Sequence, residues 1–130
     1  MAASWVLSLE AAIEAATGLA LIIYPPGVAS LLLGADLAGA GIAVARVAGI
    51  ALLSLGLVCW LSRQDADKTA TLAAMLIYNL LVTAYLMYLG FGGALVGILL
   101  WPAIAIHAVL TLLVAYVWFN DQQPRQPRPG

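Results

Sequence analysis

The chain has 130 residues, of which 65% are hydrophobic and only 8% are charged, and its mean hydropathy is +1.06. Soluble domains carry about 25% charged residues, so this chain has too few of them to cover a surface that faces water. The net charge of −1 excludes the basic surface by which proteins bind nucleic acid. The single cysteine, Cys59, allows no internal disulfide, and no Cys/His spacing typical of zinc is present. The composition therefore predicts an integral membrane protein with one domain.

Four segments are apolar over the roughly 20 residues that a membrane-crossing helix requires. They are predicted at about 5–24, 39–61, 69–90 and 98–119. The first ends at Pro25-Pro26, because proline cannot continue a helix. The apolar segment 27–37 is too short to cross and is expected to form an interfacial half-helix. The predicted fold is all-α, a four-transmembrane-helix bundle over residues 1–119, followed by a polar, proline-rich and disordered tail at 120–130.

The basic residues in the connections favour one orientation. Arg63 and Lys68 lie in the second connection, and Arg125 and Arg128 lie in the tail. The first and third connections contain no Lys or Arg. By the positive-inside rule, both termini are expected to be cytoplasmic.

Each predicted span carries one strongly polar residue, and the rise of 1.5 Å per helical residue places the four at compatible depths. They are Glu14, Arg46, Asn79 and His107. An unpaired charge at the bilayer centre costs at least about 2.5–3.5 kcal/mol, so we expect Glu14 to pair with Arg46 inside the bundle. Asn79 and His107 would complete the hydrogen bonds. Glu10, one turn from Glu14, has no obvious cation and is expected to be protonated unless water reaches it.

Further residues share helical faces with this set and are expected to line a pocket. They are Tyr78, Thr17, Thr83 and Thr111. For the tyrosine, packing is the alternative interpretation. Ala45 and Gly49 are spaced as a small-xxx-small contact, which predicts close approach of a neighbouring helix.

The sequence lacks the motifs of the common enzyme classes. No nucleophile–base pair, phosphate loop or nucleotide motif is recognisable, which argues against hydrolase, kinase and dehydrogenase activity, and no catalytic residue is assigned. The paired Glu-x-x-His motifs of di-iron bundles are absent, so we expect no metal. Haem would need a second ligand beside His107, and none is obvious. The polar set either fixes the bundle through hydrogen bonds or marks a functional site.

The first span ends in TGLALIIYP and the second contains ARVAGIALLSLG, with Arg46 three residues before Gly49. These stretches resemble small bacterial four-helix membrane proteins of the DoxX-like type and allied families of unknown function. The resemblance implies a multi-pass protein of the bacterial inner (cytoplasmic) membrane and, as for some DoxX-like proteins, quinone or thiol redox chemistry. Small multidrug resistance exporters share the four short helices and a glutamate in the first, and Arg46 has no place in their pattern.

Three functions stay open. The first is a binding or accessory protein, in which the cluster holds a lipid or quinone headgroup or a partner membrane subunit. The second is a small proton-coupled transporter that acts as a dimer, with Glu14 as the carrier carboxylate and His107 modulating it. The third is a membrane subunit of a redox enzyme. Many small residues on the second span favour a homodimer or a partner membrane protein within the lipid bilayer.

Overall fold

The structure is a computed structural model that describes residues 1–121. Over these residues the chain forms the helices α1 (Ala2–Ile23), α2 (Pro25–Leu33), α3 (Ala40–Ser62), α4 (Thr69–Gly92) and α5 (Leu100–Asp121). All but α2 are long and apolar enough to cross a membrane. This confirms the expected all-helical chain with four long apolar helices, the architecture of a multi-pass membrane protein. Of the tail predicted to be disordered, residues 122–130 lie outside the described part, whereas 120 and 121 belong to α5.

Proline and glycine set several helix ends. Pro25 and Pro26 follow the end of α1 and begin α2, where the missing N–H of proline costs little. Gly34 ends α2 with φ +65°, and Gly93 ends α4 with φ +71°. A glycine takes this left-handed conformation without the steric cost that a Cβ would add.

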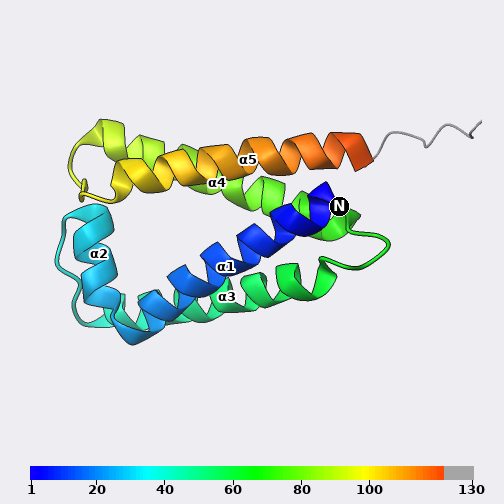
Figure 1. The fold of residues 1–130 in the computed structure, drawn as a ribbon. Coiled ribbons are helices and arrows are strands. Elements are labelled where there is room, and N and C mark those ends of the chain that lie inside the picture. The colour runs from blue at the N-terminus through cyan, green and yellow to red at the C-terminus, as the bar shows by residue number, and fades with distance from the viewer. Residues whose placement is uncertain (122–130) are drawn as a thin grey trace, which may run out of the picture.

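The four long helices form two close pairs, α1 with α3 and α4 with α5 (Figure 1). Glycine explains the approach of α1 and α3. A Cβ on Gly49 would lie 2.7 Å from the Gly18 carbonyl oxygen, and a Cβ on Gly18 would lie 2.6 Å from the Gly49 oxygen. Further along α3, a Cβ on Gly56 would lie 3.0 Å from the Ala11 oxygen. The small residue predicted to admit a neighbouring backbone, Gly49, therefore joins α3 to α1.

The short helix α2 and the α4–α5 connection lie together at one end of the bundle (Figure 1). The Gly97 N–H donates to the Leu32 carbonyl at 3.1 Å, and the Leu99 N–H donates to the Leu31 carbonyl at 2.9 Å. These carbonyls belong to the last turn of α2, which leaves them without intrahelical donors. The segment expected to form a half-helix at 27–37 is thus helical as α2, and its location at a membrane interface stays a prediction.

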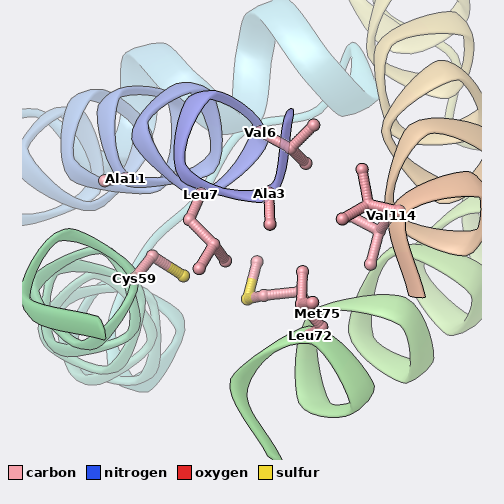
Figure 2. Close-up of a cluster of buried hydrophobic side chains, with 9 residues drawn as sticks. Ala3, Val6, Leu7, Ala11, Cys59, Leu72, Met75 and Val114 are labelled. Carbon is pink, nitrogen blue, oxygen red and sulfur yellow. The ribbon is translucent and has the colours of Figure 1, made fainter. Parts of the chain in front are cut away.

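Two buried apolar clusters lie on either side of a polar layer. The first joins all four long helices, and Figure 2 shows Leu7, Cys59 and Met75 pointing toward one another, with Val114 beside them. The second cluster, nearer α2, contains Leu86, Leu100 and Ile104. Along α4, the buried Asn79 falls between these clusters. On α1, the buried Glu10 and Glu14 lie on either side of Ala11, which belongs to the first cluster.

Candidate functional site

The two carboxyl groups of α1 are the most deeply buried polar groups of the candidate site. Glu10 is 0% exposed and Glu14 is 1% exposed. Residues four apart lie on one face of a helix, so both side chains leave α1 in the same direction. On the side of α3, Gly56 has no side chain, and a Cβ there would lie 3.3 Å from the Glu14 Cβ. The backbone of α3 therefore packs against α1, while the carboxyl groups reach α4.

Asn79 of α4 connects the carboxyl of Glu10 to the imidazole of His107. Its Nδ2 donates to the Glu10 Oε1 at 2.8 Å and to the Met75 carbonyl at 3.0 Å, and its Oδ1 lies 2.9 Å from the His107 Nδ1. Because the amide oxygen only accepts, the His107 Nδ1 must carry the hydrogen of this bond. In the neutral imidazole, Nε2 is then free to accept a proton. Asn79 thus fixes the tautomer of His107.

Tyr78 holds the second carboxyl group. Its hydroxyl donates to the Glu14 Oε2 at 3.1 Å. Its ring also meets the His107 imidazole edge to face, with 6.0 Å between the centroids. Tyr78 and His107 are both half-buried, so they form the more accessible edge of the cluster. We call the five residues Glu10, Glu14, Tyr78, Asn79 and His107 the polar cluster.

Each carboxyl group of the polar cluster keeps one oxygen without a partner. Glu10 Oε2 and Glu14 Oε1 are buried and receive no hydrogen bond from the described residues. The oxygens that are bonded receive neutral donors, an amide and a phenol. Within residues 1–121, no cationic side chain reaches either group. A buried polar atom left unpaired costs roughly 1–3 kcal/mol, so these two oxygens call for an explanation.

Arg46 does not join the cluster, and the expected Glu14–Arg46 pair is not formed. Arg46 is exposed, and its Nε donates to the Ile22 carbonyl at 3.3 Å. In a continuous helix, this carbonyl would accept the N–H of residue 26, but Pro26 has none. A cation at the C-terminal end of a helix also interacts favourably with the helix dipole. Arg46 therefore caps the end of α1, where the Ile22 carbonyl has no backbone donor because residue 26 is a proline.

The three threonines contribute less than expected. Thr17 is exposed. The Thr83 hydroxyl donates to the Asn79 carbonyl at 2.7 Å, and the Thr111 hydroxyl donates to the His107 carbonyl at 2.8 Å. Both hydroxyls thus bond their own helix one turn back, as threonine often does in helices, and offer no donor to the cluster. Tyr78, expected only to line a pocket, is instead the partner of Glu14. Adjacent residues of a helix point in different directions, so its position beside Asn79 gives no signal for this contact.

The donor set of the cluster suits protons and hydrogen bonds better than a metal. Among residues 1–121, no group of three His, Cys, Asp or Glu side chains is arranged to hold a metal ion. Cys59 is a free, buried thiol within the first apolar cluster. The arrangement can hold protons on two carboxyl groups and can accept hydrogen bonds from an incoming donor.

Comparison with protein-family models, curated proteins and solved structures found no match for this chain. The resemblance to DoxX-like proteins stays a prediction.

Proposed function

We propose that this chain is a membrane binding protein whose polar cluster takes the polar head of an amphipathic ligand, or a polar side chain of a partner membrane subunit. Its setting would be the bacterial inner membrane, with both termini cytoplasmic and the chain in a dimer or a larger complex. The observation that carries the proposal is the pair of buried carboxyl oxygens without partners, Glu10 Oε2 and Glu14 Oε1.

Electrostatics support protons on the carboxyl groups when no ligand is bound. Ionised side chains near the middle of a membrane are costly, and the cost grows when no cation is near. The hydrogen-bond partners of Glu10 and Glu14 are neutral, so they do not offset a negative charge. Two carboxylates one helical turn apart would also repel each other. In the proposal each carboxyl therefore holds a proton at rest. The arrival of a cationic head would release at least one of them.

The chemistry of the free oxygens favours a particular head group. Once its carboxyl has released the proton, a free oxygen is an acceptor and complements a group that donates hydrogen bonds, such as an ammonium. A quinone has only acceptor oxygens, so it would bind by accepting the O–H of a protonated carboxyl. Arg46 lies outside the cluster and supplies no guanidinium that would favour a phosphate there. An amine-bearing amphipath is therefore the first choice, and a quinone is the alternative.

The packing of the helices supports access between the two pairs. Within the α1/α3 pair, glycines bring backbones into contact. Between the pairs, the polar cluster is bridged by long side chains, from Glu10 to Asn79 and from Glu14 to Tyr78. Side chains can change rotamer to admit a ligand, whereas helices whose backbones touch admit one only by moving apart. A head group would enter at the half-buried edge formed by Tyr78 and His107.

A second candidate function, proton-coupled transport, is favoured by the hydrogen-bonded series from Glu10 through Asn79 to His107. His107 lies at the half-buried edge of the cluster, and its Nε2 would take up and release protons there. Transport would require the binding step above and, in addition, exposure of the cluster to each side of the membrane in turn.

Proton release on binding tests the proposed function. The purified chain in a weakly buffered detergent solution is titrated with dodecylammonium, and bound ligand and released protons are measured. We expect saturable binding with about one proton released per bound ligand. The double variant Glu10→Gln/Glu14→Gln keeps the shape of both side chains and should lose the proton release and at least tenfold of the affinity.

Asp36→Asn is the matched control, because Asp36 is an exposed acid in the α2–α3 connection. It should behave as the unmodified chain. Equal proton release by the double variant and the unmodified chain would refute the proposal. Dodecanol, a neutral donor, should bind without releasing protons. In liposomes, proton flux that requires both dodecylammonium and the two glutamates would extend binding to transport, and its absence would leave binding alone.

A further inference from the structure

A separate hollow lies at the end of the bundle where α1 begins and α3 joins α4. Its volume is about 550 Å³, and its lining includes Trp5, Ser8, Arg63, Gln64 and Lys68. No acidic side chain is among the residues that line this hollow. Its electrostatic complement is therefore an anion.

The two cations that line the hollow are oriented by backbone carbonyls. The Arg63 guanidinium lies 3.4 Å above the centre of the Trp60 ring and donates to the Trp60 carbonyl. The Lys68 ammonium donates to the Asp65 carbonyl. An arginine has five N–H donors and a lysine three, so both keep donors for a phosphate.

Two acids of the α3–α4 connection, Asp65 and Asp67, do not line the hollow. Asp67 Oδ1 accepts the backbone N–H of Thr69, the first residue of α4, at 2.9 Å, and this bond lowers the pKa of Asp67. Asp65 is exposed and does not line the hollow. Both carboxylates still oppose an anion at long range, so neutralising Asp65 should strengthen anion binding.

An apolar groove lined by residues of α1 and α3 lies next to this hollow. It has a volume of about 510 Å³, and Ala12, Ala15, Leu53, Leu57 and Trp60 line it. Ser8 lines both the groove and the hollow. The hydroxyls of Ser8 and of Ser54, which also lines the groove, donate to carbonyls of their own helices, so the groove wall offers little to a polar ligand. A cationic hollow and an apolar groove thus adjoin at Ser8.

We propose that the hollow and the groove together bind one anionic phospholipid. Its phosphate lies between Arg63 and Lys68, and one acyl chain follows the groove past Ala12 and Leu57. Trp5 and Trp60 stand where the polar and apolar parts of the lipid meet, the level that tryptophan favours in membranes. This site shares no residue with the polar cluster and does not depend on its function.

Native mass spectrometry of the delipidated full-length chain tests the site. The chain is titrated in detergent with phosphatidylglycerol or with phosphatidylcholine that carries the same acyl chains. We expect one phosphatidylglycerol to bind at least tenfold more tightly than phosphatidylcholine. The double variant Arg63→Gln/Lys68→Gln should weaken that binding about 30-fold, since each basic residue near an anionic lipid contributes about a fivefold effect. Asp65→Asn should strengthen it.

Two further variants separate the lipid from a simple anion. Ala12→Leu fills part of the groove at an exposed position and should weaken binding of phosphatidylglycerol without changing its preference over phosphatidylcholine. Arg46→Gln removes an exposed cation outside the hollow and should have no effect. Equal binding of the two lipids, displacement of the lipid by millimolar inorganic phosphate, or an unchanged Ala12→Leu variant would each overturn the proposal. Slow labelling of Cys59 by a thiol dye verifies that each variant is folded, because this thiol is buried.

Discussion

Replacing Asn79 by alanine tests whether the polar cluster holds the two helix pairs together. The change removes the donor to Glu10 and the acceptor of His107, at 2.8 and 2.9 Å. Hydrogen bonds between membrane helices contribute about 0.6 kcal/mol on average and about 1.7 kcal/mol at most. The loss of two such bonds is thus expected to lower the free energy of unfolding by about 1–3 kcal/mol.

The single cysteine supplies the assay. Cys59 is fully buried in the apolar cluster beside the polar layer, so a thiol dye reaches it only after the bundle opens. When closing is faster than labelling, the labelling rate follows the equilibrium population of the open state. A loss of about 1–3 kcal/mol then raises the rate about 5- to 150-fold.

Thr83→Ala is the matched control, because the Thr83 hydroxyl bonds only its own helix. Its labelling rate should stay within about twofold of the unmodified chain. If Asn79→Ala labels no faster than Thr83→Ala, the bonds of Asn79 do not hold the pairs together and our account of the cluster fails.

Three further expectations use the same labelling assay. Gly49→Ala would place a Cβ 2.7 Å from a backbone oxygen, where ordinary contacts begin at 3.4 Å, so it should lower the free energy of unfolding by about 1–3 kcal/mol. Gly92→Ala is the control, because its Cβ would meet nothing within 4 Å and should lower that free energy far less. Equal labelling rates of the two variants would contradict the close approach of α1 and α3. Arg46→Gln should cost less than about 1 kcal/mol, as for a cation at a helix end, and a loss of about 3–5 kcal/mol would indicate the buried ion pair that the structure lacks. Tyr78→Phe and Glu14→Ala should show a coupling energy of about 0.6–1.7 kcal/mol in a double-mutant cycle, and additive effects would argue against their bond.

Much of the secondary structure could be predicted from local features. Long apolar runs define the four long helices, and Pro25-Pro26 separates the first of them from α2. The helix ends differ from prediction by only a few residues. The hydrogen bonds from the α4–α5 connection to α2 could not be predicted, since they join residues 31 and 32 to 97 and 99 through backbone groups that carry no sequence signal.

The polar cluster could be predicted in part. Helical rise placed Glu14, Asn79 and His107 at one depth, and the structure brings all three into one layer with Glu10. The predicted pairing of Arg46 with Glu14 is wrong, because Arg46 instead binds the Ile22 carbonyl that Pro26 leaves without a backbone donor. Tyr78 took the place of that partner.

The sequence by itself determined which segments are long and apolar enough to be membrane helices, because this follows from local composition. Only the tertiary structure decided which polar side chains meet. That depends on which residues of neighbouring helices lie opposite one another, and this is set by contacts between distant residues. The glycine contacts place Gly56 of α3 opposite Glu14, whereas Arg46 lies beside Ile22 at the end of α1.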